Sequence, residues 1–282
     1  MIDTQILVCY ESYCGSDLCI VPASLHHKHT ETQKQQKKHY SKSCILQRQE
    51  ALDYCSGFHS VFLIHSLGHA IHRCKSKEAL STNENDCWTL LSYQKGQVGC
   101  FLEHLKVATE LAANDPLSML MLSGGQTRIS AGPRSESASY LDALELLNHP
   151  NLPTLQNRIY TEDYARDSLQ NLLFSLCRFH QITSIFPAKI SMVGFPFKAR
   201  RFRELHAKEV LRGLKVEFEY VAVECEGAEE AEDDAYPAFQ SDPKGCGADL
   251  LKKRILRNPF SQLHPYTSCP HPLISSSCHY KV

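Results

Sequence analysis

The chain has 282 residues, of which 43% are hydrophobic and 22% charged, and its formal net charge is −1. The apolar content excludes a globally disordered protein, and the balanced charge argues against binding nucleic acid by bulk charge. No apolar run reaches the ~18 to 20 residues of a membrane span, and no secretory signal is legible at the start, so we expect a cytoplasmic protein without a membrane span.

Residues 1–57 are expected to form a poorly ordered, flexible N-terminal extension. The stretch 26–48 carries six Lys and Arg residues against only Glu31, and it is rich in Gln and His. Low hydrophobicity with a local charge excess is typical of a solvated segment. A contact with an acidic surface or a nucleic acid is the alternative reading of this stretch.

From Phe58 onwards, short apolar strands alternate with amphipathic helices. The alternation predicts βαβ units, and hence an α/β domain over 58–262 with a mainly parallel sheet covered by helices on both faces. The predicted strands are 60–64, 117–122, 158–160, 189–193 and 216–223, and the predicted helices are 98–113, 135–147, 164–179 and 199–211.

Beyond the last strand, residues 224–240 are expected to form an acidic loop, because 224–234 contain seven acidic residues and no basic ones. The apolar residues of 241–262 suggest that this segment docks on the core. Residues 263–282 are expected to be a frayed tail.

The cysteine pattern predicts neither a disulfide framework nor a zinc module. Thirteen Cys are scattered along the chain without a CxxC pair, so most are expected to be reduced. A possible metal cluster is Cys269, His271, Cys278 and His279, but its spacing fits no common zinc module. We therefore predict no metal site there.

Polar residues are dense directly after the predicted strands, where parallel sheets bind ligands. Four consecutive strand ends each supply glycine or charge. The candidate ligand-binding residues are Gly68, His69, Gly124, Gly125, Arg128, Ser168, Lys198 and Arg201, and the candidate catalytic residues are Glu136, Glu162 and Asn171.

The Gly124-Gly125 pair lets the backbone approach a ligand closely, so its N–H groups could form an anion-binding nest. The alternative is a tight turn without a ligand. Ser135 is predicted to cap the following helix, with Glu136 in its first turn.

The acidic residues near the third strand also have two readings. Glu136 and Glu162 could act as a general base or hold Mg²⁺ across a pocket. Asp167, one helical turn before Asn171, could instead cap a helix. His69 is at least as compatible with a structural hydrogen bond as with catalysis.

In order along the chain, these motifs resemble the SanA/ElyC/YdcF-like family, also described as domain of unknown function 218. The resemblance covers about 58–260 and rests on Gly68, SGGQTR with the following SE, TED-ARDS-N and VGFPFKARRF, and it is nearest to the eukaryotic branch. It implies a Rossmann-like three-layer fold with a polar cleft, and S-adenosylmethionine as a ligand known for one member. By position, the cleft would comprise Gly124, Gly125, Glu136, Glu162, Ser168, Asn171 and Arg201. The chain departs from the family at Gln170, where Glu is common, and at Lys198, where many bacterial members have His.

These features predict a hydrolase or transferase acting on an anionic, phosphate-bearing small molecule. Gly124, Gly125, Arg128 and Arg201 would hold the anion, a glutamate would serve as base, and Asn171 would orient the substrate. The alternative is a non-catalytic protein that binds a nucleotide or S-adenosylmethionine. Mg²⁺ and S-adenosylmethionine are the two cofactor candidates, and no nucleic-acid partner is expected.

Overall fold

The computed structural model describes residues 58–65, 74, 76, 79–80, 87–225 and 235–280. The expected N-terminal extension, Gly68, His69 and most of the acidic loop lie outside these residues. Among the helices described, none has both the length and the apolar character required to cross a membrane.

Five parallel strands form one sheet in the order β3-β2-β1-β4-β5. The strands are β1 (Ser60–His65), β2 (Ser118–Ser123), β3 (Ile159–Glu162), β4 (Lys189–Gly194) and β5 (Glu217–Ala222). The chain builds outward from β1 to β3 and then returns to the other side of β1 with β4. This reversal is the topological switch of a doubly wound sheet, and ligands bind such sheets at the carboxyl ends of the strands.

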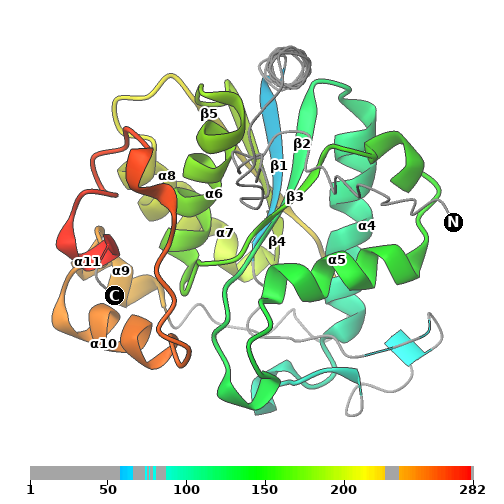
Figure 1. The fold of residues 1–282 in the computed structure, drawn as a ribbon, viewed down its shortest axis with the longest axis horizontal. Coiled ribbons are helices and arrows are strands. Elements are labelled where there is room, and N and C mark those ends of the chain that lie inside the picture. Colours follow the sequence, from blue (N-terminus) through cyan, green and yellow to red (C-terminus); the bar gives the residue numbers. More distant parts are fainter. Residues whose placement is uncertain are drawn as a thin grey trace, which may run out of the picture.

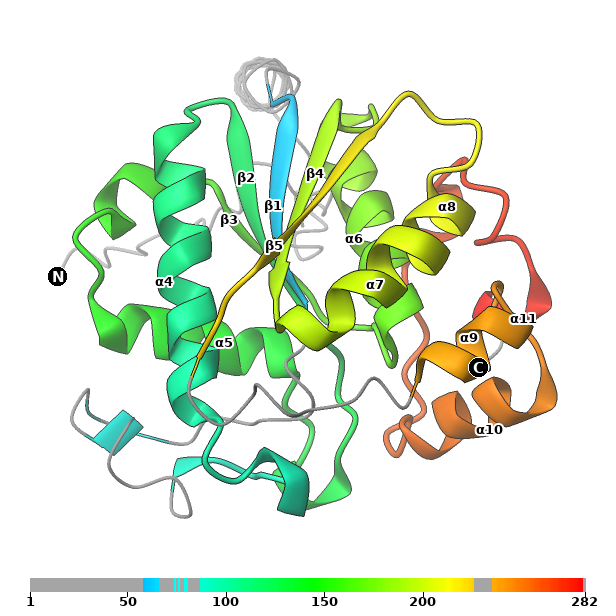
Figure 2. The same cartoon turned by 180° about the vertical axis from the view of Figure 1, so that it is seen from behind.

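Helices cover both faces of the sheet, which gives the expected Rossmann-like three-layer α/β fold (Figures 1 and 2). On one face lie α4 (Val98–Asn114) and α5 (Glu136–Leu147), packed over Leu120, Leu122 and Val193. On the other lie α6 (Ser168–Thr183) and a helix made of α7 (Ala199–Arg201), the π-helical turn η5 (Phe202–His206) and α8 (Ala207–Val210). The central strands β2 and β4 are buried almost throughout, as expected of a parallel sheet covered on both faces, whereas the edge strand β5 exposes Glu217, Glu219 and Ala222.

The expected helix over 164–179 begins four residues later than predicted. The side chain of Asp167 accepts a hydrogen bond from the backbone N–H of Gln170 and caps α6. This cap is the structural role that the sequence left open for Asp167, and it fixes the helix start at Ser168. Ser135 caps α5 as predicted, accepting a hydrogen bond from the N–H of Ala138.

The chain after β5 wraps around the α6–α8 face. It forms α9 (Tyr236–Ser241), α10 (Ala248–Leu256), the short turn η6 (Tyr266–Ser268) and α11 (Ser277–Tyr280), seen in orange and red in Figure 1. Tyr266, Leu273 and Ile274 are part of the hydrophobic core beside α6. The expectation of a frayed tail is therefore wrong for residues 263–280, because apolar side chains separated by Pro and Ser still reach the core.

The expectation of reduced cysteines is also wrong for the described chain. All eight cysteines there are paired in disulfides, namely Cys74–Cys87, Cys100–Cys225, Cys177–Cys269 and Cys246–Cys278. Folding brings together partners up to 125 residues apart, which the spacing along the sequence cannot show. Two members of the candidate cluster for which no metal site was predicted, Cys269 and Cys278, belong to different disulfides.

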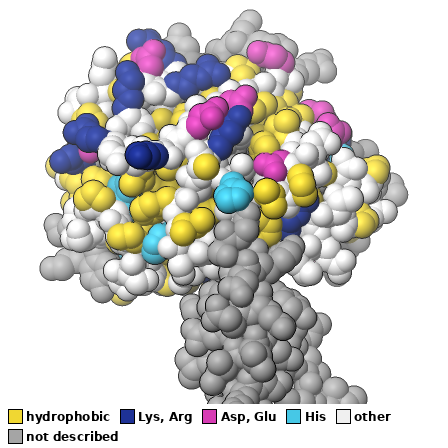
Figure 3. Space-filling model, turned by 90° about the horizontal axis from the view of Figure 1, so that it is seen from above, with side chains coloured by type: hydrophobic (Ala, Val, Ile, Leu, Met, Phe, Trp, Pro, Cys, Tyr) yellow, Lys and Arg dark blue, Asp and Glu magenta, His cyan; other side chains and the backbone are white. Residues whose placement is uncertain are grey.

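Figure 3 shows the edge of the sheet at which the strands begin, seen from above. Lys and Arg side chains gather on one side of this face, and hydrophobic side chains lie among the polar ones. Leu117 and Ile185, which precede β2 and β4, are 48% and 42% exposed. The predicted site residues belong to the opposite edge, where the strands end.

Candidate functional site

The carboxyl ends of β2 and β3 bring together residues that are about 40 positions apart in sequence. Ser123 ends β2 and Glu162 ends β3, and the two are paired in the strand register. The hydroxyl of Ser123 donates to Glu162 Oε2 at 2.7 Å, and Asn171 Nδ2 donates to Ser123 Oγ at 2.9 Å. Two predicted catalytic residues, Glu162 and Asn171, are thus joined through a serine that the sequence did not single out.

Glu162 is fully buried and is surrounded by donors from the protein itself. Besides Ser123, the backbone N–H of Tyr164 donates to Oε1 at 2.8 Å, the N–H of Ala165 to Oε2 at 3.3 Å, and the hydroxyl of Tyr266 to Oε1 at 3.1 Å. The carboxylate therefore fixes the loop after β3 and ties the C-terminal segment to the sheet. Asn171, only 2% exposed, acts within the same network.

Two opposing effects set the pKa of Glu162. Burial raises the pKa and outweighs the hydrogen bonds from Ser123, Tyr164 and Tyr266, which lower it, so that it reaches about 7. Many catalytic acids and bases have a pKa near neutral pH, as this carboxyl group does. In this protein, however, the hydrogen-bonding positions around Glu162 are occupied by side chains and backbone of the chain.

The Gly124-Gly125 loop does not form the expected anion nest. The N–H of Gly124 donates to the carbonyl of Glu162 at 2.9 Å, and the N–H of Gly125 donates to the carbonyl of Ala165 at 2.8 Å. The carbonyls of both glycines accept in turn from the first N–H groups of α5, those of Glu136 and Ser137. The prediction of a nest is wrong because the loop after β3 and the start of α5 take up these backbone groups.

Close approach of the backbone nevertheless requires glycine at position 125. A Cβ built there would lie 2.7 Å from the carbonyl oxygen of Ala165, closer than real Cβ contacts. The glycine thus serves a contact between two loops, which is the tight-turn alternative in a more specific form.

Glu136 lies in a group of charged and phenolic side chains beside the start of α5. Thr127 Oγ1 donates to Glu136 Oε1 at 2.7 Å. Partial burial raises the pKa of Tyr93, the charges of Arg257 and Arg128 lower it, and the charge of Glu136 raises it. The four charged or phenolic groups therefore lie within electrostatic reach of one another. Of these, the sequence predicted Glu136 and Arg128 and missed Tyr93 and Arg257.

Two further arginines, Arg254 and Arg166, are buried next to this group. Arg254 is fully buried and pairs through Nε with Asp167 Oδ2, while its Nη1 donates to the carbonyl of Gly245 at 2.7 Å. Arg257 Nη1 donates to the carbonyl of Arg166 at 2.9 Å. Burial and then the charge of Arg254 lower the pKa of Arg166 to about 10. Arg254 of α10 and the C-cap residue Arg257 thus contact the start of α6.

Ser168, the first residue of α6, contacts a histidine on η5. Its hydroxyl lies 2.8 Å from Nε2 of His206, which is fully buried. Burial lowers the pKa of His206 well below its ordinary value, and the charge of Arg201 lowers it further, so the imidazole is neutral at neutral pH. Arg201, 5% exposed, therefore lies beside the Ser168–His206 pair.

Lys198 lies in an aromatic environment. Its Nζ lies 5.2 Å from the ring centre of Phe195 and 5.5 Å from that of Phe197. These distances indicate cation–π contacts. The structure thus gives Lys198 a packing role at the carboxyl end of β4, and its predicted ligand-binding role stays a prediction.

Besides Ser123, sequence reasoning missed five residues of the site: Tyr93, His206, Arg254, Arg257 and Tyr266. All five come from segments outside the strand ends on which the search for a site was based. The signal available for the arginines was their spacing of three in KKRILRNPF, which places both on one side of a helix.

Comparison with known proteins adds one relative. The chain is 27% identical over 216 residues to the uncharacterized protein YOR238W of Saccharomyces cerevisiae, and the match covers 59% of this chain and 71% of the yeast protein. No family model matches the chain, so the resemblance to the SanA/ElyC/YdcF-like family stays a prediction. No solved structure matches it.

Proposed function

We propose that this protein binds an anionic, phosphate-bearing small molecule at the carboxyl edge of its sheet, and that it is a hydrolase or transferase acting on that molecule. One observation carries the proposal: four arginines, of which Arg166 and Arg254 are buried, lie close enough to destabilise one another's charge. Burial is the main cause that lowers the pKa of Arg166 and of Arg257. The charge of Arg254 lowers the first further and that of Arg128 the second, while nearby carboxylates offset part of both effects. An anion between such groups would relieve this repulsion.

Guanidinium groups, rather than backbone N–H groups, are the anion-binding elements in this proposal. Each presents a planar fork that matches two phosphate oxygens. Arg128 and Arg257 are the principal residues that bind the anion. The charges of both lower the pKa of Tyr93, and neither forms an ion pair with a carboxylate among the described residues. Arg254, whose Nε is engaged by Asp167, holds the surrounding structure in place.

Glu136 is the proposed general base, and Glu162 is a positioning residue. Glu136 lies beside Arg128, Arg257 and Tyr93, whereas Glu162 is enclosed by four donors. Neither carboxylate fits Mg²⁺ well, because a divalent cation would be repelled by the arginines around the first and would have to displace the donors of the second. No step through Mg²⁺ is derived.

Ser168 is the proposed contact to the substrate on the α6 side. It is partly exposed at the start of a helix, where the first N–H groups lack intrahelical partners and favour negative charge. Its hydroxyl has a neutral imidazole, His206, within hydrogen-bond distance to accept its proton.

The test measures binding and turnover separately. Pyrophosphate and AMP are titrated calorimetrically into the wild type, Arg257→Gln and Arg128→Gln, with Arg212→Gln as the control because that side chain is 73% exposed and pairs with Glu209. We expect each of the first two variants to bind at least tenfold more weakly and the control to bind as the wild type does. Equal affinity in all four proteins would refute the assigned anion site.

Turnover is then followed on a panel of phosphoesters with the wild type and Glu136→Gln. We expect hydrolysis or transfer of at least one ester by the wild type and a loss of at least a hundredfold in the variant. Binding of AMP or S-adenosylmethionine without turnover of any ester would favour the alternative, a non-catalytic binding protein.

A further inference from the structure

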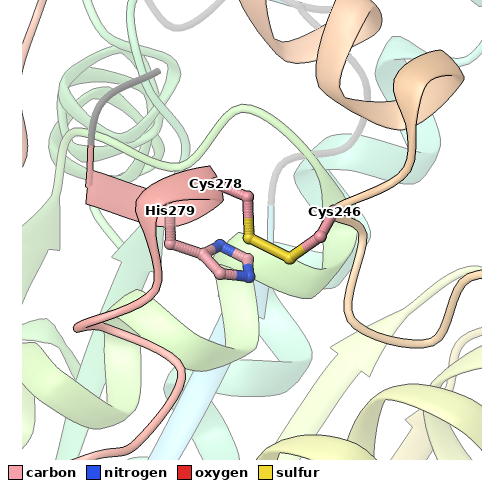
Figure 4. Close-up of side chains that lie close together, drawn as sticks. All are labelled: Cys246, Cys278 and His279. Atoms are coloured by element: carbon pink, nitrogen blue, oxygen red, sulfur yellow. A yellow bond between two sulfur atoms is a disulfide. The ribbon is translucent and has the colours of Figure 1, made fainter.

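Cys246, Cys278 and His279 form a cluster (Figure 4). It lies by α10 and α11, on the side of the molecule away from α4 and α5 (Figure 1). Cys246 lies in the turn before α10, and the other two residues lie in α11. One ligand atom from each side chain lies within 4.8 Å of the others, and the two sulfurs are joined in a disulfide. Chain segments more than 30 residues apart thus place two sulfurs and an imidazole together.

The hydrogen bonding of His279 leaves one ring nitrogen available toward the sulfurs. Nε2 lies 3.0 Å from the carbonyl oxygen of Lys244 and must donate to it, since a carbonyl only accepts. The proton therefore resides on Nε2, and Nδ1 carries a lone pair. Among the described residues, Nδ1 has no hydrogen-bond partner, although His279 is fully buried. A ring N–H donated to a backbone carbonyl is the usual arrangement around a metal-binding histidine.

We propose that Cys246, Cys278 and His279 bind a zinc ion when the two cysteines are reduced. Two thiolates and an imidazole are the ligands that Zn²⁺ prefers, at about 2.3 Å for sulfur and about 2.0 Å for nitrogen. Ligands at those distances are separated from each other by about 3 to 4 Å, so the three atoms need to move by only about 1 Å. The fourth position of a tetrahedral site is left to water.

A dithiol reductant converts the Cys246–Cys278 disulfide into the reduced state that binds zinc. A dithiol reduces the Sγ–Sγ bond, becomes a disulfide itself, and leaves two cysteine thiols. Zn²⁺ then displaces one proton from each thiol and takes the Nδ1 lone pair, so that two protons are released. The same two sulfurs cannot form the disulfide and bind the metal at once, so the states are exclusive.

The disulfide and the zinc site would each connect α11 to the turn before α10. The carbonyl of Gly245, next to Cys246, accepts the hydrogen bond from Arg254, whose other nitrogen pairs with Asp167 at the start of α6. The zinc site would therefore hold the C-terminal segment in place in a reducing environment, where the disulfide is absent. This inference does not depend on the proposed function.

The test uses the full chain, reduced with a dithiol, freed of excess reductant without oxygen and titrated with Co²⁺. Tetrahedral thiolate coordination gives a sulfur-to-cobalt band in the near ultraviolet, which Zn²⁺ then removes on displacement. The same titration is run on Cys246→Ser and His279→Ala. The matched controls are Cys177→Ser and His271→Ala, because Cys177 is paired with Cys269 and His271 donates to the carbonyl of Val210.

We expect the reduced wild type and both controls to bind one equivalent more of metal than Cys246→Ser, and His279→Ala to bind at least tenfold more weakly. Cys246 is only half-buried, so its serine variant is the decisive one if His279→Ala does not fold. A reduced wild type with no such equivalent, or one whose bound metal is unchanged in Cys246→Ser, would overturn the proposal. Binding of the same equivalent by the oxidised chain would overturn it as well.

Discussion

Replacing Glu162 by glutamine tests whether burial or hydrogen bonding determines the pKa of the buried carboxyl group at the end of β3. Burial raises its pKa from 4.5 to about 7, against four hydrogen-bond donors that favour the ionised form. The side chain is 0% exposed, so solvent screening does not reduce the effect. At about 1.4 kcal/mol for each tenfold change in proton affinity, the rise corresponds to about 3 kcal/mol.

The sign follows from proton linkage. The native state binds the proton of Glu162 more tightly than the unfolded state does, so its contribution to stability is complete below pH 4.5 and is lost as the pH rises through about 7. The variant cannot ionise at this position. We therefore expect the stability of the wild type relative to Glu162→Gln to fall by about 3 kcal/mol between pH 4.5 and pH 8.

Urea unfolding at intervals from pH 4.5 to pH 8 measures this difference, with the exposed Glu145→Gln as the control. Taking the difference between two proteins removes the titration of all other groups. A gap between wild type and variant that stays constant with pH would refute the dominance of burial. A gap that widens in favour of the wild type would show that the four donors hold Glu162 ionised at neutral pH.

Two further predictions concern the loop and the ion pair that fix this edge. Gly125→Ala should lower the free energy of unfolding by about 1–3 kcal/mol, because the added Cβ meets a backbone oxygen at 2.7 Å. Gly99→Ala, at an open helical position, should be neutral or stabilising by up to about 1 kcal/mol, and urea unfolding compares the two. Arg254→Met should cost about 3–5 kcal/mol at pH 7, because it leaves Asp167 buried without its partner. The exposed Lys252→Met on the same helix is the control, and an equal effect of both substitutions would contradict the assigned ion pair.

Much of the fold could be predicted because its signals are local. Apolar runs such as that of β2 and the amphipathic pattern of α4 each depend on neighbouring residues, and their alternation dictates a parallel sheet with helices on both faces. The helix cap at Ser135 is local in the same way. The late start of α6 was missed because Asp167 was given two readings, and only the structure shows that it is the cap.

The site was predicted only in part. The sequence shows where the backbone can be approached closely, but it does not show whether a ligand or another loop of the protein approaches it. Gly124 and Gly125 do permit close approach, yet the partner is the loop after β3 rather than a ligand. Glu162 and Asn171 do meet, through the hydroxyl of Ser123. The rule that ligands bind beyond strand ends selected these residues correctly as neighbours and left their roles open.

Pattern reasoning predicted that residues 241–262 dock on the core, but it could not predict which contacts the C-terminal segment makes, and these contacts change how the site is understood. Its contributions are single side chains inserted from a segment with little periodicity: Tyr266 on Glu162, and Arg254 on Asp167. Each of these contacts gives a buried carboxylate at the carboxyl edge of the sheet a hydrogen-bond or ion-pair partner. A carboxylate left there without a partner would lower the free energy of unfolding by several kcal/mol. The α/β body and the C-terminal segment therefore depend on each other. Loss of the link at Cys246 should accordingly destabilise the start of α6, and not only the chain end in which Cys278 lies.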